Sequence, residues 1–589
     1  MTRSTTTDQP AIKTDSLSDA LDSLAHTSLA RLTRGVSPVT GLLAWYDWVS
    51  HLAISPGKQR SLLDDALNKQ RHFAQHALRT MTTPHCENCI EPLEQDRRFS
   101  NAAWQQWPFN LIHQGFLLQQ QWWHNATTNV RGVTRHHENL VSFAGRQWLD
   151  MFSPVNFPWT NPEVLQATAQ TGGINLWNGA MNYLDDIRRQ ALDEAPAGTE
   201  AFVVGKDVAV TPGKVVYRNQ LIELIQYAPA TPKVHATPIL IVPSWIMKYY
   251  ILDLSPHNSM VKYLVSQGHT VFIISWKNPG PADRNLGMED YRRLGVMDAL
   301  DAVTTIVPEQ KVNAVGYCLG GTLLSIAAAA MARDGDKRLN SLTLLAASVD
   351  FREPGELSLF IDESQLAWLE SVMWDKGYLD GHQMAGAFQL LNSSDLIWSR
   401  RMREYLLGER QEQFDLMAWN ADTTRMPFRM HSEYLRRLYL NNDLAEGRYI
   451  VDGKPVMLND IRVPVYAVGT VRDHVTPWQS AYKIHHLISG ADISFVLTSG
   501  GHNAGVVSPP DHPRRTFQAA TRKAGEQYTD PQSWRTRTPL QKSSWWPNWQ
   551  TWLAEQSAGQ RTAPPPMGGS AESGYAAIHD APGLYVRQR

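Results

Sequence analysis

Residues 311–332 read KVNAVGYCLGGTLLSIAAAAMA, and this stretch decides the fold. A β-type run from Lys311 to Val315 leads into a helical run from Thr322 to Ala332, and a glycine-rich turn holds Cys318 between them. A strand, a tight turn and a helix in this order form a nucleophile elbow, here with cysteine in the position of the usual serine. The helix N-terminus behind such a turn also stabilises a thiolate. We therefore predict that Cys318 is a nucleophile, in preference to a small buried hydrophobic residue, which is the other common role of a free cysteine.

A nucleophile at an elbow needs a base and an acid, and in folds of this kind both follow it along the chain. The base is predicted to be His502, which lies in the glycine-flanked run TSGGHNAG at residues 498–505, directly after a β-type run. Asp473 follows another β-type run and should orient His502 from the same edge of the sheet. Asp350 also follows a predicted strand and is a rival for the acid. The neighbouring His474 is either a second base or a residue of the turn.

Two backbone N–H groups are predicted to form an oxyanion hole. The residue after the nucleophile, Leu319, supplies the first. The second comes from the loop after the early β-type run Ile239 to Val242, where the donor is the backbone of Ile246 or Trp245. No cofactor and no metal site is expected.

The chemistry of sulfur narrows the reaction. A thiol that attacks a thioester forms another thioester, which conserves an activated acyl group for a later attack by a hydroxyl. Cysteine at this elbow therefore favours acyl transfer or polymerisation from acyl-CoA over the hydrolysis that a serine lipase performs, with CoA as part of the substrate and as a product.

The pattern of apolar and polar residues along the 589-residue chain predicts an α/β-hydrolase fold with an inserted helical lid, preceded by a helical N-terminal domain. Short β-type runs begin after Gly198, and one expected strand covers Ala201 to Val210. The predicted parts are a disordered N-terminus (1–20), a helical N-terminal domain (21–198), a catalytic domain (199–560) with a lid at about 351–460, and a mobile C-terminal tail (561–589) rich in Pro, Gly, Ser and Ala.

Composition excludes several other roles. The 55 basic and 57 acidic residues are interspersed and give a formal net charge of −2, so no nucleic-acid role is expected. No apolar run approaches the roughly 18 residues of a membrane span, and the polar N-terminus does not read as a secretion signal. We expect a cytoplasmic protein. The run His85-Cys86-Glu87-Asn88-Cys89 has metal-ligand residue types, but no second cysteine pair completes a zinc site.

Several motifs beyond the elbow occur in a fixed order. They are DRRF at 96–99 with AW at 103–104, SPVNFPWTNPE at 153–163, KYYILDL at 248–254, DH at 473–474, GH at 501–502 and SWWP at 544–547. In these motifs the chain resembles the class I polyhydroxyalkanoate synthases, which polymerise (R)-3-hydroxyacyl-CoA into storage polyester and release CoA. The resemblance covers most of the chain, from residue 96 to residue 547.

This resemblance implies that Cys318 carries the acyl group, that His502 is the base and that Asp473 is the third member. It also implies a homodimer at the surface of polyester granules, inactive while the lid is closed, with 3-hydroxybutyryl-CoA as the expected monomer. The sequence departs from the family at 425–435, where a more aromatic stretch is usual, and at Met247, where asparagine is common. The alternatives are a cysteine hydrolase or depolymerase of the same fold, or a non-catalytic granule-surface protein.

Overall fold

A computed structural model describes residues 36–589 except 83–86, 94–95, 382, 385, 387–392 and 558, together with residues 25, 26, 29 and 33. The predicted disordered N-terminus, residues 1–20, therefore lies outside the described residues. Among the described residues, no helix combines the length and the apolar character needed to span a bilayer.

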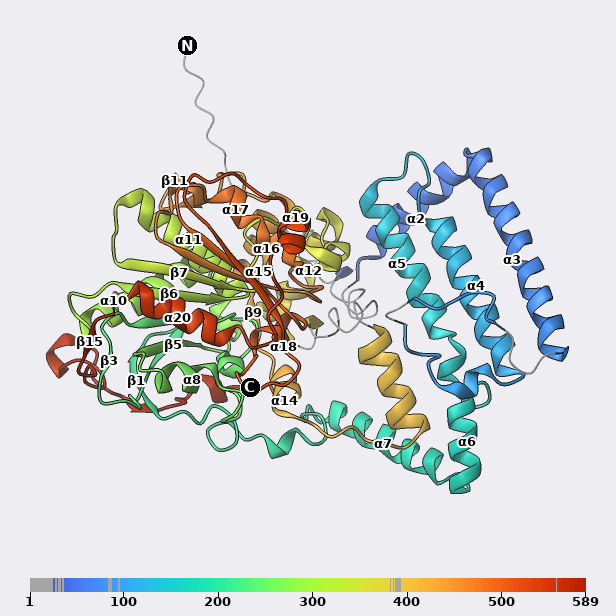
Figure 1. The fold of residues 1–589 in the computed structure, drawn as a ribbon, viewed down its shortest axis with the longest axis horizontal. Helices are drawn as coiled ribbons and strands as arrows, with labels where there is room; N and C mark the ends of the chain where they lie inside the picture. The colour runs from blue at the N-terminus through green and yellow to red at the C-terminus, as the bar shows by residue number, and fades with distance from the viewer. Residues whose placement is uncertain are drawn as a thin grey trace, which may run out of the picture.

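The catalytic part is built on one ten-stranded sheet with the order β14-β13-β12-β7-β6-β4-β5-β2-β1-β16 (Figure 1). Its strands are β1 (Gly213–Arg218), β2 (Ile222–Tyr227), β4 (Ile239–Val242), β5 (Val271–Trp276), β6 (Val312–Tyr317), β7 (Leu339–Leu345), β12 (Val465–Thr470), β13 (Ile493–Thr498), β14 (Phe517–Arg522) and β16 (His579–Asp580). The six strands from β13 to β5 pair in parallel, and the outer strands pair antiparallel. The carboxyl ends of the parallel strands therefore share one edge, where ligands bind in open α/β sheets.

Apolar runs explain why the parallel strands occupy the middle of the sheet. Every residue of β4, β5, β6, β12 and β13 is buried, as expected for strands covered on both faces. One face packs against α10 (Asp298–Ile306), α11 (Leu319–Asp334) and α16 (Trp478–Tyr482). The other face packs against α8 (Met260–Ser266) and α20 (Trp546–Gln556). This three-layer arrangement confirms the predicted α/β fold.

The N-terminal part is a separate group of helices beside the sheet domain, seen at the right of Figure 1. It contains α2 (Pro38–Ala53), α3 (Pro56–Thr82), α4 (Phe109–Thr127), α5 (Arg135–Met151), α6 (Pro162–Thr171) and α7 (Ile174–Ala191). Its own small core gathers around Phe99, Trp104 and Phe116. The half-buried guanidinium of Arg98 lies against this core and pairs with Asp150 at 2.7 Å.

The segment inserted after β7 connects the two parts. It holds α12 (Glu363–Lys376), α14 (Asp415–Ala421) and α15 (Phe428–Tyr434), with π-helical turns η9 (Met402–Leu406) and η10 (Leu435–Leu440). On the helical side, the amide of Asn175 donates to the Leu406 carbonyl at 2.9 Å, and Arg410 pairs with Asp186 at 2.6 Å. The carbonyl oxygen of Tyr405 lies so close to Gly179 of α7 that any side chain there would collide with it. The insertion thus spans from the sheet edge to α7 (Figure 1).

The expected strand from Ala201 to Val210 is wrong. These residues form a turn closed by an isolated bridge between Val204 and Val208, and Gly205 at its centre has a φ of +84°. The Asp207 carboxylate accepts the backbone N–H of Val203 at 3.0 Å. Local turn chemistry therefore overrides the β propensity of the valines.

The prediction of a mobile C-terminal tail is also wrong. β16 adds to the edge of the sheet by pairing with β1. The backbone N–H groups of Leu584 and Tyr585 donate to the fully buried carboxylate of Glu223 at 2.8 and 2.9 Å. The Pro and Gly residues of this segment, residues 561–589, form turns at which the chain changes direction. The segment, called the C-terminal strap below, therefore follows the surface while hydrogen bonds hold its ends.

Candidate active site

Cys318 occupies a strained turn between β6 and α11. Its backbone has φ 53° and ψ −123°, a conformation that costs a non-glycine residue free energy, and its N–H donates to the Leu345 carbonyl at 2.9 Å. The glycines make this turn possible. A Cβ on Gly316 would lie 2.3 Å from the Cα of Gly321, and a Cβ on Gly320 would lie 2.1 Å from the Val242 carbonyl oxygen. The backbone of the elbow therefore packs directly against the end of β4 and the loop that follows it.

The Asp473 carboxylate is held firmly beside His502. Its Oδ1 accepts the backbone N–H groups of Val475 and Thr476 at 3.0 and 2.8 Å. Its Oδ2 accepts the Thr470 hydroxyl at 3.1 Å and lies 2.8 Å from His502 Nδ1. Both carboxylate oxygens are thus engaged in two contacts each, which hold the side chain in place. The carboxylate therefore fixes the orientation of the imidazole and keeps a proton on its Nδ1.

The second nitrogen of the imidazole faces the nucleophile. His502 Nε2 is buried and makes no hydrogen bond to another described residue, and Cys318 is close enough to the imidazole to shift its pKa. Burial lowers the pKa of His502, but the Asp473 carboxylate and then Cys318 outweigh it and raise that pKa well above its usual value. Burial likewise raises the pKa of Asp473, yet the charge and hydrogen bond of His502 bring it below its usual value. The structure thus brings Cys318, His502 and Asp473 together as a triad.

The two rival residues lie elsewhere. The Asp350 carboxylate accepts the Asn442 side-chain amide at 3.2 Å and the backbone N–H of Arg352 at 2.9 Å, and it makes no hydrogen bond with His502. His474 is exposed in the turn after β12. Neither residue takes part in the triad.

The loop after β4 places its backbone against the elbow. Trp245 accepts the Thr424 hydroxyl at 2.7 Å and Ile246 accepts the Thr424 N–H at 3.4 Å, so the inserted segment holds this loop through its carbonyl groups. The N–H groups of Leu319 and Ile246 donate no hydrogen bond to another described residue. Both remain available to a ligand oxygen.

Comparison with known proteins assigns the family. Family models described as the N-terminus of poly-β-hydroxybutyrate polymerase (PhaC) and as a poly-β-hydroxybutyrate polymerase N-terminal region match residues 95–264 and 16–58. A poly(3-hydroxyalkanoate) polymerase of Methylorubrum extorquens is 41% identical over 506 residues, which cover 85% of this chain and 82% of that protein. The chain belongs to the poly(3-hydroxyalkanoate) polymerase family. The polymerase subunit PhaC of Cupriavidus necator is 37% identical over 84% of this chain and 83% of its own length. Membership makes the chain an enzyme, a polymerising acyltransferase.

A third family model, the α/β hydrolase fold, matches residues 237–509 and confirms the predicted fold class. Solved structures that align include a monoacylglycerol lipase of Paleococcus ferrophilus, at 11% identity over 58% of this chain and 99% of that one, with a TM-score of 0.31. A thioesterase domain from the curacin biosynthetic pathway aligns at 16% identity over 50% and 94% of the chains, with a TM-score of 0.27.

Sequence reasoning missed several polar side chains around this polymerase-family triad. The hydroxyl of Tyr317, next to the nucleophile, donates to Asn503 at 2.7 Å and so ties the elbow to the helix that carries His502. From the inserted segment, the hydroxyls of Tyr434 and Tyr439 lie 3.1 Å apart. Burial raises the pKa of both phenols, and the charge of Cys318 raises it further. Tyr317 was visible in the elbow motif, whereas no sequence spacing links the other two to Cys318.

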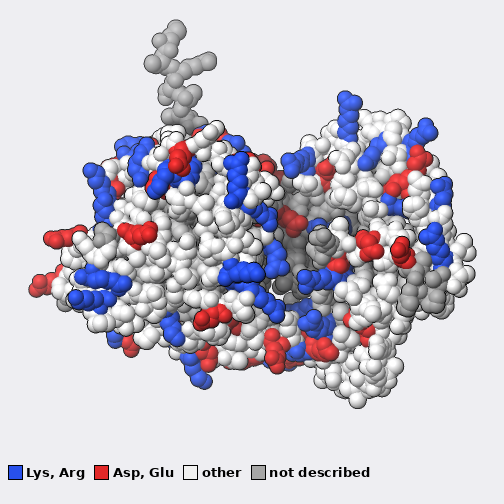
Figure 2. Space-filling view, in the orientation of Figure 1, with Lys and Arg blue, Asp and Glu red and all other residues white. Residues whose placement is uncertain are grey.

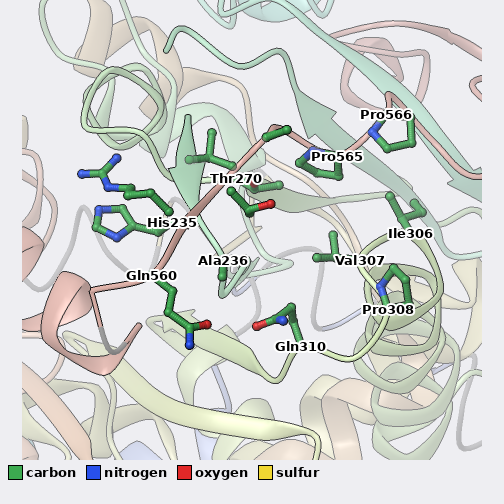
Figure 3. A pocket seen from close by; sticks show the side chains of 14 residues that line it. His235, Ala236, Thr270, Ile306, Val307, Pro308, Gln310, Gln560, Pro565 and Pro566 are labelled. Carbon is green, nitrogen blue, oxygen red and sulfur yellow. The ribbon is translucent and has the colours of Figure 1, made fainter. Parts of the chain in front are cut away.

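A separate pocket of about 590 Å³ lies away from the triad, at the amino ends of β4 and β5 (Figure 3). His235, Thr270 and Gln310 line it together with Pro565 and Pro566 of the C-terminal strap. Because it opens at the opposite edge of the sheet from Cys318, it forms no part of the candidate site. Of the His85 to Cys89 run, His85 and Cys86 lie outside the described residues.

Proposed function

We propose that this enzyme polymerises (R)-3-hydroxyacyl-CoA, with 3-hydroxybutyryl-CoA as the expected monomer, through an acyl thioester on Cys318 and with release of CoA. The observation that carries the proposal is a cysteine, not a serine, on a strained elbow beside a buried His502–Asp473 pair. A thioester intermediate retains enough activation to be attacked by a hydroxyl, which is the step that lengthens a polyester.

Loading begins when His502 Nε2 takes the proton from the Cys318 thiol. The thiolate attacks the carbonyl carbon of the acyl-CoA, and the N–H groups of Leu319 and Ile246 stabilise the oxyanion that forms. The carbon–sulfur bond to CoA then breaks, and the CoA thiolate takes the proton back from the imidazolium. Asp473 stabilises the imidazolium throughout, because its carboxylate is already hydrogen-bonded to Nδ1.

Elongation reuses the same groups. The hydroxyl of a hydroxyacyl group gives its proton to His502 Nε2 and attacks the acyl carbon on Cys318. An ester bond forms, the carbon–sulfur bond breaks, and the Cys318 thiolate regains the proton. The reaction needs no cofactor, because CoA enters as part of the substrate and leaves as a product.

The proposal extends to a homodimer on the surface of a cytoplasmic polyester granule. Its support is the exposed apolar surface of the N-terminal helices. Leu42 and Tyr46 of α2 are 67% and 72% exposed, and Trp177 and Leu184 of α7 are 69% and 56% exposed. Exposed apolar residues concentrated on helices mark surfaces that bind a partner or an apolar phase.

The test mixes purified protein with (R)-3-hydroxybutyryl-CoA and measures free CoA and solvent-extractable polyester. Cys318→Ala is the inactive variant. Cys89→Ala is the matched control, because Cys89 is another cysteine, hydrogen-bonded to Gln114 in the helical part. Polymer and CoA that disappear only in Cys318→Ala support the proposal. CoA with free hydroxy acid and no polymer would make the chain a hydrolase, and turnover that survives in Cys318→Ala would refute the role of the cysteine.

A further inference from the structure

Two arginines flank the loop that carries the catalytic histidine. Arg472 follows β12, and its backbone N–H donates to the Gly500 carbonyl at 2.9 Å. Arg515 precedes β14, and its Nη1 reaches the Ser499 carbonyl at a long 3.5 Å. Ser499 and Gly500 belong to the loop that leads directly into His502. The two guanidinium-bearing residues are thus fastened to the rim of the site from both sides.

No carboxylate of a described residue forms an ion pair with these arginines. Within the part of the chain that the structure describes, neither Arg472, Arg514 nor Arg515 forms an ion pair, in contrast to most of the arginines of the inserted segment. Asp473, the nearest carboxylate in sequence to Arg472, already receives four hydrogen bonds from other groups. Positive charge is therefore left uncompensated beside His502.

The electrostatics of the neighbours agree with this geometry. Arg515 is half-buried, and its Nε is buried without a hydrogen-bond partner among the described residues. Burial and then the charge of Arg472 lower the pKa of Arg515. Burial, Arg515 and Arg514 lower the pKa of His512 in the same way. Figure 2 shows Lys and Arg side chains gathered over the part of this face where Figure 1 places α18 (His502–Val506).

Holding like charges together without a counter-ion costs free energy, and a bound anion would offset that cost. We propose that Arg472 and Arg515, with Arg514 beside them, form an anion subsite that binds the phosphate groups of the CoA part of the substrate. This inference rests on the proposed function. The pantetheine arm separates the phosphates of CoA from its thioester, so the phosphates should lie at the rim of the site, where Arg472 and Arg514 are exposed, and not beside Cys318.

The test compares two substrates, (R)-3-hydroxybutyryl-CoA and the pantetheine thioester of the same acid, which keeps the reacting end but lacks the phosphates and the adenosine of CoA. The principal variant is Arg472→Gln, because Arg472 is exposed and its side chain makes no hydrogen bond or ion pair with another described residue. Arg515→Lys keeps the charge and loses the planar fork. Arg293→Gln removes an exposed arginine that lies on the helix before α10 and serves as the matched control.

Arg472→Gln should raise the KM for the acyl-CoA about tenfold, the effect of one lost charge-assisted hydrogen bond, and change kcat by less than about twofold. The KM for the pantetheine thioester should not change, and Arg515→Lys should have a smaller effect on the acyl-CoA. Equal losses with both substrates would overturn the subsite and assign the arginines to loop structure. An unchanged KM for the acyl-CoA would overturn it as well.

A direct binding measurement separates this inference from the proposed function. Calorimetry with free CoA should show about tenfold weaker binding to Arg472→Gln than to the wild type and to Arg293→Gln. If the wild type released no CoA from any thioester, the proposed function would fail, while CoA affinity would still decide the subsite. Equal affinity of all three proteins for CoA would refute the anion subsite alone.

Discussion

Replacing Asp473 with asparagine tests the triad at the carboxylate that orients His502. The backbone N–H groups of Val475 and Thr476 donate to Oδ1, so the asparagine must keep its carbonyl oxygen on that side. Its NH₂ group then faces His502 Nδ1, where the carboxylate oxygen lies 2.8 Å away in the native protein. A donor at this place forces Nδ1 to accept, which puts the imidazole proton on Nε2. The histidine can then no longer take the proton of the Cys318 thiol.

We expect kcat for CoA release to fall by a factor of about 10³ to 10⁴, the cost of the wrong tautomer in a triad, which corresponds to about 4 to 5.5 kcal/mol. The assay measures the initial rate of free CoA formation from (R)-3-hydroxybutyryl-CoA. CoA is quantified by chromatography, because a thiol reagent would also react with Cys318. Asp350→Asn is the control, since Asp350 bonds Asn442 and not the imidazole, and its kcat should change by less than about fivefold. If Asp473→Asn kept more than about a tenth of the native kcat while it remained folded, the assignment of Asp473 would be refuted.

Three further changes test other parts of the structure. Tyr317→Phe removes the hydrogen bond to Asn503 and should lower kcat about fivefold, with an unchanged melting temperature; an unchanged kcat would show that this tie does not position the imidazole. Gly320→Ala forces a methyl group against a carbonyl oxygen and should lower the free energy of unfolding, measured in urea, by about 3 kcal/mol. Gly41→Ala is the comparison, because a Cβ added at this helical glycine meets no atom within 4 Å, and it should raise that free energy by about 0.5 to 1 kcal/mol. Burial lowers the pKa of His485 to about 3, so below about pH 6.5 only the unfolded chain takes up a proton at this residue, and the free energy of unfolding should fall by about 1.4 kcal/mol per pH unit. His485→Phe should remove this part of the pH dependence of stability between about pH 6.5 and pH 5. An identical pH dependence in the variant would contradict this reasoning.

Local patterns account for what the sequence could predict. The elbow is a strand, a turn and a helix within 22 residues, so its glycines and its cysteine report the geometry directly. His502 and Asp473 could be placed for a related reason. Each follows an apolar run long enough to be a buried parallel strand, and the ends of such strands meet at one edge.

The parts that could not be predicted depend on contacts between distant segments. The C-terminal strap is held by Glu223, more than 350 residues earlier, and its polar composition conceals that partner. The reach of the inserted segment to α7 depends on hydrogen bonds such as Asn175 to Leu406, which no periodicity reveals. Tyr434 and Tyr439 approach Cys318 only because the insertion folds back over the sheet edge.

The central claim is that Cys318 carries the growing acyl chain as a thioester. Its most direct test is mass spectrometry of the intact protein and of its peptides after brief mixing with (R)-3-hydroxybutyryl-CoA and acid quenching. We predict a mass increase of one or more hydroxybutyryl units on the peptide that contains Cys318, formed at the rate of CoA release and absent from Cys318→Ala. Acyl groups on another residue, or CoA release and polymer growth with Cys318 unmodified throughout turnover, would contradict it.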